Sequence, residues 1–127
     1  MATLSERSYS AAVLLTNVLV KNCPKDTWNL ARNGIWIVQE DGQYYVCIGG
    51  ERARYAVYTE EPWEKGKNPN EGWIERSIEE ALPFMRNIMT GNITESEVND
   101  YIAQCEESVR KQQMARVREL LEKRDSI

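Results

Sequence analysis

The chain has 127 residues, a formal net charge of −4 and a sequence pI near 5.0. Its 42% hydrophobic content is enough for a packed core and excludes a disordered chain, and the length fits one domain. The acidic balance disfavours nonspecific nucleic-acid binding, which depends on a basic surface.

The sequence contains no histidine and only three scattered cysteines, Cys23, Cys47 and Cys105. This composition excludes the usual zinc-ligand patterns and the Ser-His and Cys-His nucleophile pairs, and it predicts no cofactor and no enzyme activity. The odd cysteine count, the lack of a leader-like N-terminus and the lack of an apolar run of about 20 residues predict a cytoplasmic protein without membrane contact.

The first predicted element is a helix over residues 8–22. Val13, Leu14, Leu15, Val18 and Leu19 form its core-facing stripe, and Pro24 follows its end. The run 18–20 is also compatible with a strand, so that alternative stays open. A short helical turn is expected over residues 28–32.

A β-meander over residues 35–58 is the clearest prediction. Two β-rich runs, 35–39 and 43–48, flank Asp41-Gly42, the sequence typical of a tight hairpin turn in which both residues have positive φ. The pair Gly49-Gly50 predicts a second turn and a third strand over 52–58. Residues 59–72 are predicted to be a loop, and Trp73-Ile74 could add a fourth strand.

Two helices are predicted after the loop. The first covers residues 77–90, opened by a capping box of Ser77 and Glu80 and kinked or broken at Pro83. The second covers residues 95–123, opened by a capping box of Thr94 and Glu97. The predicted fold class is therefore α+β: a three- or four-stranded antiparallel meander packed with one N-terminal and two C-terminal helices.

Three surfaces are candidates for binding. The first is the outer face of the meander, where Arg52, Arg54 and Tyr58 alternate with core residues and Tyr45 lies on the same side. Arginine beside tyrosine suits a phosphate, a carboxylate or a stacked base. An ordinary solvated strand face is the alternative interpretation.

The second candidate is the loop with its flanking aromatics. It offers two tryptophans and two lysines: Trp63, Lys65, Lys67 and Trp73. A tryptophan in such a segment either covers the core or contributes to a binding site. The loop is therefore either a lid that holds an anion or a cover for the core.

The third candidate is the tail of the last helix. Its apolar seam Val98, Ile102, Cys105 and Val109 stops at Gln112, and a second stripe resumes one step round the helix. We expect this second stripe to support self-association through Val109, Met114, Val117, Leu120 and Leu121. Glu106–Arg110, Glu107–Lys111 and Glu119–Lys123 are candidate i, i+4 ion pairs, which also fit a simple solvated face or a basic strip for a partner.

These observations predict a non-catalytic binding protein that forms a homo-oligomer and holds a host protein or a small anionic, nucleotide-like ligand. In organisation the chain is similar to small accessory proteins with which phages and mobile elements inhibit or sequester host components, although no particular residue carries that resemblance. The alternatives are a purely structural or regulatory assembly protein and, less favoured, a small enzyme that depends on carboxylates or a lone cysteine.

Overall fold

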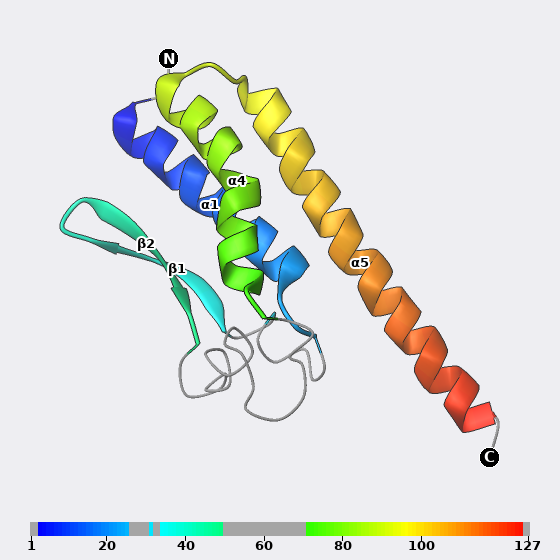
Figure 1. The fold of residues 1–127 in the computed structure, drawn as a ribbon. Helices are drawn as coiled ribbons and strands as arrows, with labels where there is room; N and C mark the ends of the chain where they lie inside the picture. The colour runs from blue at the N-terminus through cyan, green and yellow to red at the C-terminus, as the bar shows by residue number, and fades with distance from the viewer. Residues whose placement is uncertain (1–2, 26–30, 32–33, 50–70, 126–127) are drawn as a thin grey trace.

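The structure, a computed structural model, describes residues 3–25, 31, 34–49 and 71–125. These residues form three helices and a two-stranded antiparallel sheet, which confirms the α+β class: α1 (Leu4–Asn22), β1 (Ile35–Glu40), β2 (Gln43–Ile48), α4 (Trp73–Thr90) and α5 (Glu95–Asp125). α1 is central, because α4, α5 and both strands pack against it (Figure 1).

α1 begins four residues earlier than predicted and ends where expected. Thr3 is its N-cap, and the Thr3 hydroxyl oxygen accepts a hydrogen bond from the backbone N–H of Glu6 at 3.1 Å. Leu14, Val18 and Leu19 are buried, as the apolar stripe predicts. The strand alternative for residues 18–20 is therefore wrong.

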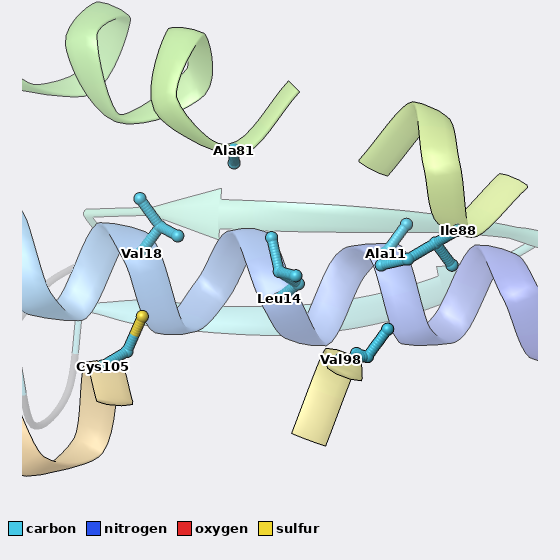
Figure 2. Close-up of a cluster of buried hydrophobic side chains, with 7 residues drawn as sticks. All are labelled: Ala11, Leu14, Val18, Ala81, Ile88, Val98 and Cys105. Carbon is cyan, nitrogen blue, oxygen red and sulfur yellow. The ribbon is translucent and has the colours of Figure 1, made fainter. Parts of the chain in front are cut away.

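The main core lies where the three helices meet (Figure 2). Ala81 of α4 has no exposed surface, and its small side chain allows α4 to approach α1 closely. The cluster contains side chains from all three helices: Ala11, Leu14, Val18, Ala81, Ile88, Val98 and Cys105. The predicted seam on α5 is thus confirmed at Val98 and Cys105.

A second buried cluster attaches the hairpin to the helices. Trp73 of α4 packs with Leu19 and Cys23 at the end of α1, and Val46 and Ile48 of β2 lie against this group. The predicted core side of the second strand is confirmed at these two residues. The Trp73 cluster therefore joins α1, α4 and the hairpin.

The β1–β2 hairpin has the predicted turn. Asp41 and Gly42 have φ values of 52° and 75°, the positive values that a two-residue type I′ turn requires. Ile35 pairs with Ile48 and Glu40 with Gln43 in an antiparallel register. The predicted third strand, 52–58, and most of the predicted turn, 28–32, lie outside the described residues. The suggested fourth strand is wrong, because Trp73-Ile74 begins a helix.

The predicted start of α4 at Ser77 is wrong. The helix begins at Trp73 after Gly72, whose φ of 75° is left-handed. The buried Ser77 hydroxyl donates to the Trp73 carbonyl at 2.6 Å, and Glu80 binds Lys21 instead of capping a helix. The helix also continues through the exposed Pro83, so the predicted break does not occur.

The capping box that opens α5 is confirmed. The Thr94 hydroxyl oxygen accepts from the Glu97 backbone N–H at 3.1 Å, and the Thr94 backbone N–H donates to the Glu97 carboxylate at 3.3 Å. α5 then runs for 31 residues, about 46 Å at about 1.5 Å per residue.

We expect Leu14→Ala to lower the free energy of unfolding by about 2–5 kcal/mol, because it opens a cavity at a residue with 0% exposure. Leu4→Ala is the matched control on the same helix, since Leu4 is 68% exposed, and it should change stability by less than about 0.5 kcal/mol. Urea unfolding followed by circular dichroism measures both, and equal effects would contradict this core assignment.

Candidate functional site

The clearest candidate site is the apolar side of the C-terminal half of α5. Met114, Val117, Leu120 and Leu121 have exposed fractions between 44% and 52%. We call these four residues the α5 outer stripe. Large apolar side chains that gather on one helix side, and are exposed to this degree, are typical of an interaction surface.

Three residues of the α5 outer stripe, Met114, Val117 and Leu121, face away from the rest of the molecule, and Leu120 lies on the flank of the stripe. Val98, Cys105 and Gln112 follow one another at intervals of seven residues and mark the side of α5 that rests on α1. At about 100° per residue, Val117 and Leu121 lie about 140° and 180° round the helix from Gln112. Folding of this chain therefore leaves the stripe uncovered in the part that the structure describes.

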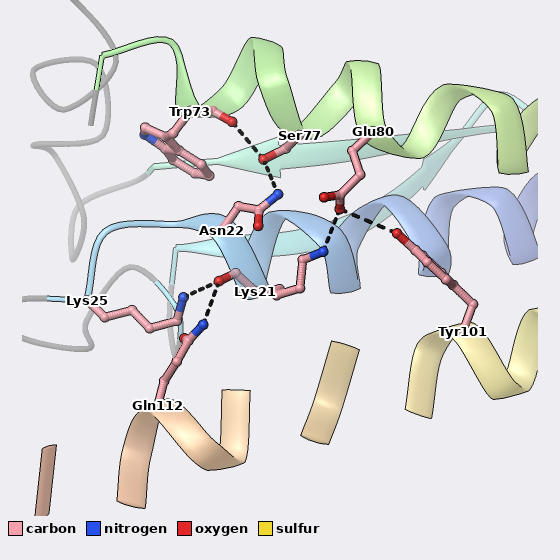
Figure 3. A network of polar contacts seen from close by, with 8 residues as sticks. All are labelled: Lys21, Asn22, Lys25, Trp73, Ser77, Glu80, Tyr101 and Gln112. Carbon is pink, nitrogen blue, oxygen red and sulfur yellow. Dashed lines mark hydrogen bonds and ion pairs between the residues drawn. The ribbon is translucent and has the colours of Figure 1, made fainter. Parts of the chain in front are cut away.

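Gln112 marks the end of the contact between α5 and α1. Its side-chain amide donates to the Lys21 carbonyl at 3.2 Å, one residue before α1 ends at Asn22 (Figure 3). The Lys25 ammonium donates to the same carbonyl at 2.6 Å. In the sequence, Gln112 interrupts the apolar seam. In the structure, it donates a hydrogen bond to a carbonyl at the C-terminal end of α1 that has no partner within that helix.

The segment 113–125 then continues beyond the helical body for about 20 Å at about 1.5 Å per residue (Figure 1). Local ion pairs stabilise it: Glu119 binds Arg116 at 3.3 Å and Lys123 at 3.5 Å. The Glu119–Lys123 pair was predicted. Hydrogen bonding from Arg116 is the largest cause that lowers the pKa of Glu119, with the Lys123 charge next.

Arg110 pairs differently from the prediction. Its guanidinium binds the Glu107 carboxylate at 2.7 Å and 2.9 Å, three residues away, and not Glu106. The hydrogen bond from Arg110 lowers the pKa of Glu107. Such exposed pairs contribute little to global stability, but they favour the helical conformation of the segment that contains them.

The outer face of the β1–β2 hairpin is the second exposed apolar surface. Trp36 and Tyr45 are 40% and 48% exposed, and the register places Trp36 opposite Cys47 and Val38 opposite Tyr45. Tyr45 was predicted to lie on this face. Trp36 and Val38 were missed, although their alternation with Ile35 and Ile37 carried the signal.

The remaining predicted binding residues divide into two groups. Trp73 is buried in the second core cluster, in line with the core-covering alternative, and offers no ring to a ligand. The others lie outside the described residues: Arg52, Arg54, Tyr58, Trp63, Lys65 and Lys67. Val109 is half-buried, so it lies at the edge of the body-facing side of α5 and not on the α5 outer stripe.

A polar network connects the three helices near Cys105 (Figure 3). The Glu80 carboxylate binds the Lys21 ammonium at 2.6 Å and accepts from the Tyr101 hydroxyl at 3.4 Å. Ser77 accepts from the Asn22 side chain at 3.2 Å. These groups orient one another across helix contacts, so their arrangement is that of a structural network.

Two of the cysteine thiols are poorly suited to nucleophilic chemistry. Burial is the largest cause that raises the pKa of Cys23, which Lys25 partly offsets, and burial also raises the pKa of Cys105. Because the thiolate is the reactive species, both thiols are unreactive near neutral pH. Burial likewise lowers the pKa of Lys25.

The described residues, 3–25, 31, 34–49 and 71–125, form neither a metal site nor a membrane-spanning helix. Among them, no group of three or more cysteine and acidic side chains has an arrangement that could hold a metal ion. Of the three helices described, none has the length and apolar character to cross a membrane. Comparison with known families, curated proteins and solved structures gives no match.

The Tyr101 hydroxyl should make stability depend on pH in alkaline solution. Burial raises the pKa of Tyr101 to about 12, and the Glu80 charge adds to the shift, whereas an unfolded tyrosine titrates near about 10. Between these values the unfolded chain loses this proton and the folded chain keeps it. The stabilising contribution is therefore complete below about pH 10 and disappears towards about pH 12.

We expect Tyr101→Phe to lose less unfolding free energy between about pH 9 and about pH 11 than the wild-type protein does, because about pH 11 lies inside the window between the unfolded pKa of about 10 and the folded pKa of about 12. Urea unfolding at both pH values measures the difference. Tyr45→Phe removes an exposed hydroxyl on the hairpin and should keep the wild-type dependence. An unchanged dependence in Tyr101→Phe would show that Tyr101 titrates as in the unfolded chain.

Proposed function

We propose that the protein is a non-catalytic binding protein that self-associates through the α5 outer stripe and presents the outer hairpin face to a protein partner or a small anionic ligand. One observation carries this proposal: three large apolar side chains, Met114, Val117 and Leu121, lie on the side of α5 opposite to the body, on the segment that follows the Gln112 contact with α1, and the exposed Leu120 flanks them. Cytoplasmic location and an accessory, inhibitor-like role remain part of the proposal.

The exposed area sets the expected strength of self-association. Complete burial of a large apolar side chain contributes about 1.5–3 kcal/mol, and each stripe residue is already about half covered, so about 1 kcal/mol remains for each. A symmetric pair buries eight of them, about 8 kcal/mol before the cost of association. Since about 8.2 kcal/mol corresponds to a Kd of about 1 µM, the dimer should be weaker than micromolar.

For the hairpin we propose the third strand, 52–58, paired with β2. Gly49 has a φ of 113°, a positive value that supports a turn at the Gly49-Gly50 pair. If Gly49 and Gly50 form a two-residue turn, Arg52 pairs with Cys47 and Arg54 with Tyr45. Two arginines would then extend the face formed by Trp36 and Tyr45, a combination suited to phosphate groups and stacked rings.

The α5 outer stripe also supports the alternative function, an assembly protein whose only partner is itself. The exposed Trp36 and Tyr45 favour the first function, because an assembly built through α5 leaves these rings uncovered among the described residues. Binding of a ligand at the hairpin distinguishes the two functions.

We expect Val117→Asp/Leu121→Asp to shift the protein from dimer to monomer, raising the dimer Kd at least about 10-fold, because two carboxylates would enter an apolar contact. Light scattering at concentrations up to about 1 mM, the Kd that corresponds to about 4 kcal/mol of net association energy, measures the mass. Ile78→Asp is the control, since Ile78 is a 43% exposed apolar residue on α4. A wild-type monomer at these concentrations would refute self-association.

We expect a nucleoside triphosphate to change tryptophan fluorescence saturably, because Trp36 borders the proposed anion site. Arg52→Ala/Arg54→Ala should remain folded and lose the response. Arg86→Ala/Arg110→Ala removes the same charge from exposed positions on α4 and α5 and should retain it. A response that survives in the Arg52/Arg54 variant would exclude the hairpin as the anion site, and no response in the wild-type protein would exclude this ligand class.

A further inference from the structure

We infer that the partner of the α5 outer stripe is a second copy of the same stripe in antiparallel orientation, with a two-fold axis near Glu119; this rests on the proposed self-association. The stripe has heptad-like spacing, since Met114, Val117 and Leu121 follow at intervals of three and four residues. Antiparallel pairing of this pattern places Val117 against Leu121 of the second copy, on both sides of the axis.

The residues that continue the stripe favour the antiparallel orientation. Arg110 lies four residues before Met114, and Arg124 lies three residues after Leu121, so both extend the same line along the helix. In a parallel pair, Arg110 would lie against Arg110 of the second copy, and Arg124 would lie against Arg124 of the second copy. Antiparallel pairing places the aliphatic stem of Arg124 beside the second copy's Met114, and Arg110 beyond the described end of α5 at Asp125.

The N-terminal half of α5 gives an independent reason. At about 100° per residue, Glu95, Asn99 and Glu106 lie within about 40° of Val117 on the same side of the helix. All three are exposed. In a parallel pair the helix contact would continue into this half, and each glutamate would lie beside the same glutamate of the second copy. An antiparallel pair keeps the two N-terminal halves apart.

The flanks of the stripe agree with this orientation. On one flank, antiparallel pairing brings Leu120 against Leu120 of the second copy, which explains an exposed leucine at the edge of the stripe. On the other flank it brings Lys111 opposite Asp125 of the second copy, two oppositely charged and exposed side chains. Near the axis, Arg118 approaches Arg118 of the second copy, and the two positive charges repel. Because Arg118 is exposed, solvent screening reduces this repulsion.

This arrangement gives the pair a defined shape. The overlap covers about 20 Å of helix, and the two helical bodies lie beyond its opposite ends. The hairpin lies on the other side of α1 from α5 (Figure 1), so both outer hairpin faces stay accessible. The pair would therefore present two copies of the hairpin face, far apart, to partners or ligands.

A distance between spin labels tests the orientation. We propose Ala103→Cys, an exposed position on α5 near the line of the stripe, in a Cys47→Ser background because Cys23 and Cys105 are buried. Residue 103 lies about 24 Å from the proposed axis, so an antiparallel pair predicts labels about 50 Å apart, and a parallel pair less than about 20 Å. Adding Val117→Asp should abolish the distance.

The outcomes separate this inference from the proposed function on which it rests. Light scattering of the same labelled sample decides whether the protein self-associates: a monomer refutes both. A dimer with a short distance refutes only the antiparallel orientation. A dimer that persists with Val117→Asp shows that another surface pairs and refutes both assignments to α5.

Charge exchange provides a second test. Lys111→Glu should weaken the dimer about 3-fold, and adding Asp125→Lys should restore its affinity, because the two positions meet only between copies. Within one helix they are about 21 Å apart at about 1.5 Å per residue, too far to interact directly. Additive weakening by both changes would overturn the antiparallel register.

Discussion

The length of α1 determines how far the rest of the structure is supported. Both strands and both other helices pack against this 19-residue helix, whereas α5 has 31 residues. α5 runs alongside α1 until Gln112 binds the Lys21 carbonyl at the C-terminal end of α1. Beyond that point local ion pairs stabilise α5, and Met114, Val117 and Leu121 turn outwards. The exposed stripe is thus a direct consequence of two helices of unequal length.

Local signals predicted the parts of the fold that depend on a few neighbouring residues. The Asp41-Gly42 turn and the Thr94–Glu97 capping box form as expected, because each is completed within four residues. The Ser77–Glu80 pair has the same local pattern but does not cap α4. Burial of Trp73 extends the helix by a turn, and Lys21 takes the Glu80 carboxylate; neither contact between distant segments is visible in the sequence.

The candidate site was predictable to a similar extent. The offset between the two apolar stripes of α5 is a periodic pattern, so the sequence located Met114, Val117, Leu120 and Leu121. It did not indicate the role of Gln112, because that role depends on where α1 ends. On the hairpin, alternation placed Tyr45 correctly, while the exposure of Trp36 depends on which face of the sheet the helices cover.

Several described polar side chains near α1 serve contacts between the helices. Glu80 is occupied by Lys21 and Tyr101, and burial raises the pKa of two of the three thiols, so these particular groups already have structural roles or a thiol pKa raised by burial. Exposed rings and aliphatic side chains lie on the outer hairpin face and on α5, on opposite sides of α1 (Figure 1), and others lie on α1 and α4, among them Leu4, Ile78 and Leu82. Because the outer hairpin face and the α5 outer stripe do not overlap, occupation of one leaves the other free, and a protein built in this way can assemble and hold a partner at the same time.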